Sequence, residues 1–265
     1  MGHQDNKILG SRNVAGVTVL FLADYHIHSS WCDGEQTVNQ ILRQSKKLKL
    51  NAIAITDHAR KDSPWVTSYI SELKSYQKSS KRPLVIIGLE VKILNFNGEI
   101  DIDPNWIPNL NIVLIAIHRI PGITKENIPK FKDKIPYFYG ELLISAIKKV
   151  NLSVPTIIAH PGKWLKENDL PFIPEEMWSE IARTARKYGK IIEYNTSAPP
   201  PQQFIKLLIS EKVQLSVGSD AHRVTEIGRD VFKAIELVGD SLVKAYELMG
   251  NESDSESLCC NSREK

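Results

Sequence analysis

Short runs of apolar, β-branched residues recur along the chain. They cover residues 17–28, 51–58, 84–90, 111–118, 156–160, 190–195 and 213–222. Because these seven runs are continuous rather than alternating, they are typical of strands that are buried on both faces of a parallel sheet.

The segments between the runs repeat their apolar residues every three or four positions, which predicts amphipathic helices. These helices are expected within residues 36–50, 64–80, 136–151, 174–190, 200–212 and 224–239. The alternation of strand and helix predicts a parallel α/β fold.

Three segments depart from this alternation. Residues 90–103 contain Asn97-Gly98, a strong hairpin signal, so we expect a β-hairpin excursion after the third strand. Residues 1–12 are polar and are expected to be loose, and residues 251–265 are expected to form a disordered tail. Residues 13–250 are then expected to form a single domain.

Composition narrows the class of protein. The 42% hydrophobic and 25% charged content is ordinary for a globular chain of 265 residues, and a formal charge of +3 does not call for a nucleic-acid partner. Three cysteines, two of them adjacent, make no disulfide framework and favour a reducing compartment. No apolar run approaches the roughly 18 residues of a membrane span, so we expect a cytoplasmic protein.

The predicted strands end in residue types that bind metals. Six of the seven histidines lie at these ends, which are His26 with His28, His58, Glu90, His118, His160, Asn195 and Asp220 with His222. The carboxyl-terminal ends of parallel strands meet at one edge of the sheet, where active sites are built. Because so many imidazoles and carboxylates would be costly to gather without a cation, the pattern predicts a metal cluster.

Six ordered motifs closely resemble those of the PHP (polymerase and histidinol phosphatase) superfamily. They are DYHIHSSWCDG, AIAITDH, GLE, IAIH, IIAHPG and VGSDAH, and the resemblance runs from about residue 17 to residue 239. The resemblance implies a distorted, TIM-like barrel of seven (βα) units. It also implies two or three Zn, Mn or Fe ions and the hydrolysis of phosphate esters.

The same resemblance implies nine metal ligands, which would act catalytically through the metals. They are His26, His28, Asp33, His58, Glu90, His118, His160, Asp220 and His222. Glu90 would bridge two metals, one completed by His26, His28 and Asp220 and the other by His118 and His160. Asp33, His58 and His222 would hold a third, although the Asp33-Gly34 pair is also an ordinary turn.

Four polar positions near these motifs have two interpretations each. Asp57 could orient an imidazole or cap the next helix, and Asp24 could be a hydrogen-bond partner at the barrel mouth or be solvated. Cys32 could touch the site, but a small buried residue is the better interpretation. Asn195 ends a strand without supplying a usual ligand, which favours a structural role.

Basic residues follow four of the ligands at short range. They are Arg60, Arg119, Lys163 and Arg223. We hypothesise that at least two of them form a phosphate-binding collar, with Arg119 and Arg223 the strongest candidates because they adjoin ligands. The alternative is an ordinary solvated or ion-paired surface.

Together these features predict a phosphoesterase that attacks with a metal-activated hydroxide and needs no protein nucleophile. The expected substrate is a small phosphorylated molecule, as for a histidinol-phosphatase-like enzyme or a nucleotide or sugar phosphatase. One alternative is a nuclease or nucleic-acid-end-processing PHP domain. An amidohydrolase-type enzyme is less favoured, because such enzymes commonly carry a carboxylated lysine where the fourth run ends in His118. The oligomeric state stays open.

Overall fold

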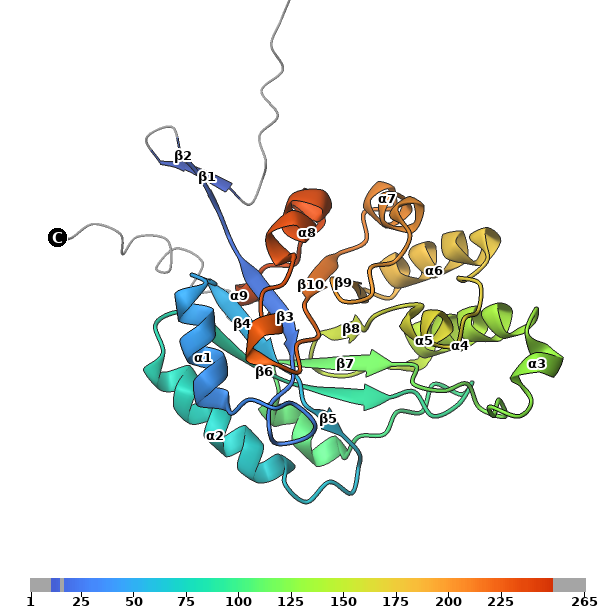
Figure 1. Ribbon diagram of the computed structural model, residues 1–265, viewed down its shortest axis with the longest axis horizontal. Helices are drawn as coiled ribbons and strands as arrows, with labels where there is room; N and C mark the ends of the chain where they lie inside the picture. Colours follow the sequence, from blue (N-terminus) through green and yellow to red (C-terminus); the bar gives the residue numbers. More distant parts are fainter. Residues whose placement is uncertain (1–10, 15–16, 250–265) are drawn as a thin grey trace, which may run out of the picture.

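Seven parallel strands form the centre of the computed structural model, which describes residues 11–14 and 17–249. Their sheet order is β3 (Ala23–Ile27), β4 (Ala52–Ile55), β6 (Leu84–Lys92), β7 (Ile112–Ala116), β8 (Thr156–Ile158), β9 (Ile191–Asn195) and β10 (Leu215–Gly218). A two-residue strand, β5 (His58–Ala59), pairs with the far end of β6. Each of the seven predicted runs contributes one strand to this sheet (Figure 1).

The first and last strands of the sheet meet at one end only. A parallel bridge joins Ile27 to Ala221, and the backbone N–H of Asp220 donates to the carbonyl of His26 over 2.8 Å. Deeper in the barrel, the buried Asp24 carboxylate accepts hydrogen bonds from the backbone N–H and the hydroxyl of Ser219. The sheet is thus a nearly closed barrel, as predicted, and Asp24 is a hydrogen-bond partner rather than a solvated residue.

Helices follow the strands and surround the barrel (Figure 1). The longer ones are α1 (Val38–Lys47), α2 (Val66–Ser79), α4 (Ile135–Lys149), α6 (Glu175–Lys187), α7 (Gln202–Ser210) and α8 (Val231–Val238). The shorter ones are α3 (Ile128–Phe131), α5 (Lys163–Glu167), α9 (Ala245–Met249) and the 3-10 turns η1 (Pro104–Asn109), η2 (Val224–Glu226) and η3 (Gly239–Ser241). Within the described residues, no helix has both the length and the apolar character needed to cross a membrane.

Both faces of the strands are buried, as their continuous apolar sequence predicts. On β4, Ile53 and Ile55 pack in the cluster that includes the large helices. Ala52 and Ala54 turn to a second cluster that includes Leu248 of α9. Both faces of the strands are therefore closely packed, which holds the strand ends in fixed positions.

Two predicted elements are divided in the structure. Residues 17–28 form two strands, because β2 (Val17–Leu20) pairs with β1 (Ser11–Val14) in a separate antiparallel hairpin and β3 begins only at Ala23. Residues 224–239 form η2 and α8 rather than one helix. Gly228 and Asp230, with φ of 71° and 51°, adopt left-handed backbone that interrupts a helix.

The β-excursion predicted after the third strand is present, with a longer turn than Asn97-Gly98 alone suggested. Ile93 and Ile100 form an antiparallel bridge, and a four-residue loop, 95–98, connects the two sides. Gly98 supplies the left-handed residue of this loop, with φ of 77°. Of the two predicted loose ends, residues 1–10 and 251–265 lie outside the described residues, while residues 11 and 12 belong to β1.

Candidate metal centre

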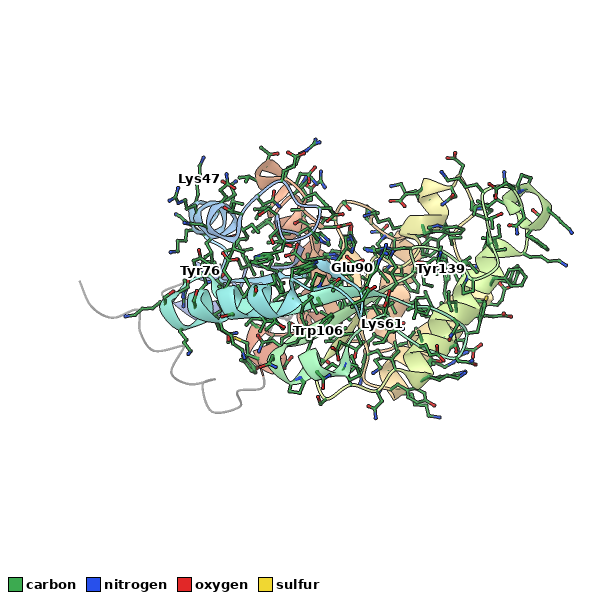
Figure 2. The ribbon with its side chains drawn as sticks, turned by 90° about the horizontal axis from the view of Figure 1, so that it is seen from below. Lys47, Lys61, Tyr76, Glu90, Trp106 and Tyr139 are labelled. Carbon is green, nitrogen blue, oxygen red and sulfur yellow. The ribbon has the colours of Figure 1, made fainter. Side chains whose placement is uncertain are left out.

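Glu90 lies at the centre of a histidine cluster. It is buried on β6, and Figure 2 shows it near the middle of the molecule, between Tyr76 of α2 and Tyr139 of α4. Five imidazoles surround its carboxylate. Oε1 is 2.8 Å from His118 Nε2 and 2.9 Å from His160 Nε2, while Oε2 is 2.9, 3.3 and 3.4 Å from His26 Nε2, His58 Nδ1 and His28 Nε2.

The remaining predicted ligands, Asp33, Asp220 and His222, follow β3 and β10, the two strands that meet at the barrel closure, and join the same cluster. Asp220 Oδ1 lies 3.3 Å from His28 Nε2. Asp33 Oδ2 lies 3.6 Å from His58 Nε2, and Asp33 Oδ1 lies 3.5 Å from His222 Nε2. The structure thus gathers all nine predicted residues at the carboxyl-terminal rim, because parallel strands end on the same side.

The ligand atoms form overlapping groups in which every atom lies within 4.8 Å of the others. The five groups are His26–Glu90–His160, His26–His28–Asp220, His58–Glu90–His118, His28–Asp33–His58–His222 and His28–Cys32–Asp57. Glu90 belongs to two of them, in keeping with the bridging role that the resemblance implies.

The donor set fits divalent transition metals. Nε2 of His26 and Nε2 of His28 are only 3.0 Å apart, so the two nitrogens converge on a position that one cation could occupy. A carboxylate has about four lone-pair sites, fewer than the five rings that surround Glu90. A shared cation satisfies these atoms, and mixed imidazole and carboxylate ligands suit Zn, Mn or Fe better than Mg or Ca.

Without a metal, protons balance part of the negative charge. Burial by itself lowers the pKa of His26, but Glu193, Glu90 and Asp220 outweigh burial and hold that pKa well above its ordinary value. For His28, burial again lowers the pKa, but the hydrogen bonds to Asp220 and Glu90 outweigh burial and raise the pKa to about 9. At His58 burial dominates and lowers the pKa to about 4, so this ring is neutral and ready to coordinate at pH 7.

Glu193 is a residue of the site that the sequence analysis missed. Its Oε1 lies 2.7 Å from Nδ1 of His26, and its Oε2 accepts the backbone N–H of His160 over 2.5 Å. A hydrogen bond at Nδ1 leaves Nε2 of His26 as the coordinating nitrogen. The available signal is a charged residue inside the apolar run 190–195, because a carboxylate within a buried strand requires a buried partner.

Asp57 and Cys32 support the loop after β3. Asp57 accepts hydrogen bonds from the N–H of Ser29 at 2.6 Å and from the Cys32 thiol at 2.9 Å, and it does not cap a helix, since α2 begins only at Val66. Burial, together with Asp57 and Asp33, raises the pKa of the Cys32 thiol far above its usual range. Cys32 therefore lies beside the cluster as a neutral hydrogen-bonding residue.

Asn195 has the structural role predicted for it. Its side-chain oxygen accepts the backbone N–H groups of Ser197 and Ala198, each over 3.0 Å. These bonds shape the loop after β9, which lines a cavity beside the cluster.

The four basic residues occupy different environments. The Lys163 ammonium is mostly buried and hydrogen-bonds Oδ2 of Asp220. Arg223 is exposed and pairs with Glu35 over 2.9 Å, while Arg60 and Arg119 are exposed. A cavity of about 230 Å³ over the cluster is lined by His58, Ile117, His118, His160, Lys163, Trp164, Glu167 and His222. Only Lys163 of the four basic residues faces it.

A family model agrees with this architecture. The model described as "PHP domain" matches residues 24–197, about two thirds of the chain. The chain belongs to the PHP domain family. The last two predicted ligands, Asp220 and His222, lie beyond the matched residues, and the barrel closure brings them to the other seven.

Curated relatives of this PHP domain are similar over most of their length. A protein of Thermoanaerobacter sp. (strain X514), described as a "probable phosphatase", is 27% identical over 82% of this chain and 86% of its own length. Another protein with that description, from Caldicellulosiruptor saccharolyticus, is 26% identical over 73% of this chain and 76% of its own length.

Two solved structures share the fold. The histidinol phosphate phosphatase of Lactococcus lactis, solved with Zn, L-histidinol and phosphate, superposes with a TM-score of 0.67 at 22% identity, covering 83% of this chain and 93% of its own. A structure from Listeria monocytogenes gives a TM-score of 0.60 at 17% identity, covering 80% and 99%. These likenesses confirm the predicted barrel.

Proposed function

We propose that this protein is a metal-dependent phosphoesterase that hydrolyses a phosphate monoester of a small molecule. The observation that carries the proposal is the convergence of five imidazoles on the two oxygens of Glu90. Membership of the PHP domain family and the phosphatase descriptions of its relatives support the same class of reaction.

Two or three Zn, Mn or Fe ions would be held by the nine residues at the rim. These are His26, His28, Asp33, His58, Glu90, His118, His160, Asp220 and His222. When bound, such ions supply an acidified water and stabilise the negative charge on phosphoryl oxygens.

The chain's own residues orient the ligands and bind the substrate. Glu193 fixes the ring of His26 through Nδ1, so that Nε2 faces the cluster. Lys163 brings a positive charge to the cavity above the histidines, where it can bind a phosphoryl oxygen. The lining of this cavity contains no serine, threonine or cysteine, and its histidines are assigned as metal ligands, so the proposal assigns no nucleophile to the protein itself.

The proposed substrate is small, because the cavity over the histidines holds about 230 Å³. The Lactococcus lactis structure, with Zn, L-histidinol and phosphate, supports both a phosphate ester as substrate and Zn as one candidate metal. A cytoplasmic location forms part of the proposal and rests on the cysteine content of the sequence.

Metal analysis coupled to a hydrolysis screen tests the proposal. Protein from metal-supplemented expression should carry at least one equivalent of Zn, Mn or Fe and should hydrolyse p-nitrophenyl phosphate. It should act weakly on bis(p-nitrophenyl) phosphate, on single-stranded DNA and on a lactone, which represent the nuclease and amidohydrolase alternatives. Glu90→Gln is the inactive control. Less than one equivalent of metal, or preferential hydrolysis of the lactone or the diesters, would falsify the proposal.

A further inference from the structure

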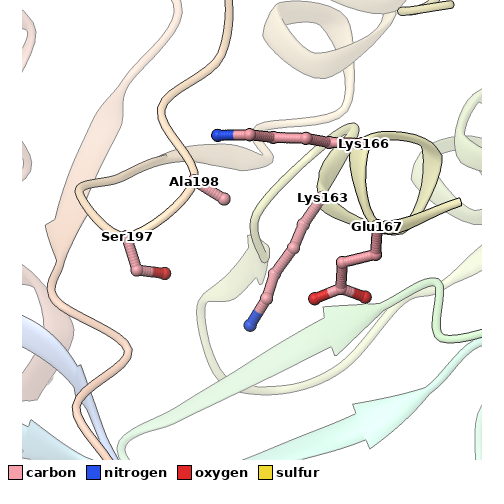
Figure 3. A pocket seen from close by; sticks show the side chains of 5 residues that line it. All are labelled: Lys163, Lys166, Glu167, Ser197 and Ala198. Carbon is pink, nitrogen blue, oxygen red and sulfur yellow. The ribbon is translucent and has the colours of Figure 1, made fainter. Parts of the chain in front are cut away.

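A second cavity adjoins the one over the histidines. It holds about 290 Å³ and is lined by Lys163, Lys166, Glu167, Ser197 and Ala198 (Figure 3). Lys163 and Glu167 line both cavities, so the two meet there. We refer to the cavity over the histidines as the inner cavity and to this one as the outer cavity.

Because the two cavities adjoin, they define how a phosphate ester would lie across them. Under the proposed function, the phosphoryl group lies in the inner cavity, over His58, His118 and His160. The ester oxygen then lies near Lys163, where the cavities meet, and the alcohol part of the substrate extends into the outer cavity. The residues of the outer cavity therefore determine which alcohol is accepted.

Two polar groups of the outer cavity, the Lys163 ammonium and the Ser197 hydroxyl, already have partners within the protein. Burial lowers the pKa of the Lys163 ammonium, but Asp220, Glu90 and Glu167 outweigh burial and raise it, so these carboxylates already stabilise Lys163. The Ser197 hydroxyl donates to Asn195 at 2.7 Å and lies 3.3 Å from Asp220.

Of the charged residues that line the outer cavity, Lys166 and Glu167 form no ion pair with another described residue, so Lys166 supplies its unpaired positive charge. In the described part of the chain, no carboxylate lies within ion-pairing distance of its ammonium group. Glu167 is its neighbour in α5, but adjacent helical residues do not face each other. Figure 3 shows Lys166 reaching across the cavity toward Ala198, while Glu167 extends toward the side of Lys163.

We propose that the outer cavity binds an alcohol that carries a second anionic group, a carboxylate or a phosphate, and that Lys166 is the residue that selects it. This inference rests on the proposed function. The substrate would be a small phosphate monoester with negative groups at both ends, one over the histidines and one at Lys166. An alcohol with a neutral or cationic end would lack a partner for Lys166.

Matched esters test the selection. Glycerol 3-phosphate and 3-phosphoglycerate differ only in a terminal hydroxymethyl group or carboxylate, and O-phosphoethanolamine is a shorter ester that ends in an amine. We expect kcat/KM for 3-phosphoglycerate to exceed that for glycerol 3-phosphate by about tenfold. Glycerol 1,3-bisphosphate carries a second phosphate where 3-phosphoglycerate carries a carboxylate. Whichever of these two esters has the higher kcat/KM identifies the anionic group that the outer cavity prefers.

A charge-reversing variant, Lys166→Glu, should lower the ratio of kcat/KM for 3-phosphoglycerate to that for glycerol 3-phosphate at least tenfold and should favour O-phosphoethanolamine. Lys206→Glu, on an exposed lysine of α7 that lines neither cavity, is the matched control and should keep the wild-type ratio. Ala198→Leu, which fills the outer cavity, should raise KM for 3-phosphoglycerate while the Ki of inorganic phosphate stays within twofold.

Equal kcat/KM values for the two glycerol-based esters, or a ratio that survives in Lys166→Glu, would overturn the inference while leaving the phosphoesterase intact. Hydrolysis of p-nitrophenyl phosphate but of none of these esters would likewise overturn the inference alone. If the metal-loaded wild type hydrolyses neither these esters nor p-nitrophenyl phosphate, the proposed function fails instead. Calorimetric titration with 3-phosphoglycerate then decides the inference separately. Binding weakened at least tenfold in Lys166→Glu supports the outer cavity, and equal binding excludes it.

Discussion

Oε1 of Glu193 lies 2.7 Å from Nδ1 of His26, and both side chains are buried. This contact reaches from the middle of β9 to the end of β3, which are not neighbours in the sheet. It is possible because Gly218 of β10 lies between them. A Cβ at Gly218 would collide with Oε1 of Glu193 and with Cβ of His26.

We expect Glu193→Gln to weaken metal binding about tenfold to a hundredfold, because a neutral amide accepts the Nδ1–H of His26 less strongly than a carboxylate does. Competition with a chromophoric chelator measures the affinity. Glu180→Gln, which removes a carboxylate that is half exposed and pairs with Lys148, is the control. Equal affinity in the wild type and Glu193→Gln would show that Glu193 does not position His26.

Metal affinity should increase with pH. The pKa of metal-free His28 is about 9, so at pH 7 a metal must displace a proton from this ring. Each displaced proton costs up to about tenfold in apparent affinity per pH unit below that pKa. Chelator competition at pH 6, 7, 8 and 9 should give rising affinity, with proton release visible by calorimetry in two buffers. A constant affinity across this range would contradict the raised pKa.

The raised pKa of His28 should also make the metal-free protein less stable as the pH rises, whereas metal affinity increases with pH. A histidine whose pKa is higher in the folded state than its unfolded value of 6.5 stabilises the fold below that pH. This stabilisation should be lost as the pH rises from about 6.5 to about 9. Urea denaturation of the chelator-treated protein at both ends of this range tests the sign.

Removing the metal should lower the melting temperature. A ligand that binds only the folded state at a hundred times its Kd adds about 2.7 kcal/mol, or about 5–10 °C for a domain of this size. Calorimetry of the chelator-treated and Zn-reloaded protein measures the shift without reference to activity. Glu90→Gln should show a smaller shift, and an unchanged melting temperature in the wild type would argue against an ordered metal site.

Asp24→Ala should destabilise the barrel by about 3 kcal/mol, because it leaves buried donors without an acceptor. The donors are the N–H and the hydroxyl of Ser219 and the N–H of Gly228. Urea denaturation gives the free energy of unfolding. Asp133→Ala, on the exposed side of the molecule, should change it by less than about 0.5 kcal/mol. Similar values for the two variants would mean that Asp24 does not stabilise the closure.

Steady-state kinetics with phosphate monoesters shows which of the four basic residues, Arg60, Arg119, Lys163 and Arg223, contribute to kcat/KM. Lys163→Met should lower kcat/KM the most, by about a hundredfold, because its ammonium is mostly buried at the cavity and touches Asp220. The collar predicted for Arg119 and Arg223 stays a prediction. Unchanged KM and kcat in Arg119→Ala and Arg223→Ala would exclude it, and Lys206→Met controls for the loss of a surface charge.

The sequence by itself determined the parallel α/β fold and the edge at which the histidines and carboxylates gather. Seven apolar runs set the strands, and their continuous character implied a parallel sheet buried on both faces. His26, Glu90 and His160 could be assigned to one edge without coordinates, because in parallel strands every carboxyl-terminal end lies on the same side. This assignment needed only the position of each residue within its own strand, since the carboxyl-terminal end of a strand is given by the chain direction.

Only the tertiary structure decided which residues support that rim. Asp24 binds Ser219, 195 positions away, and Glu193 binds His26, 167 positions away. Four basic residues follow predicted ligands at similar distances along the chain. The tertiary structure singles out Lys163, because the turn at Gly162, with φ of 91°, starts the short helix α5 that places Lys163 beside Asp220. Hydrophobic periodicity records which side chains are buried. It does not record which buried polar groups meet, because that depends on how the strands close into a barrel.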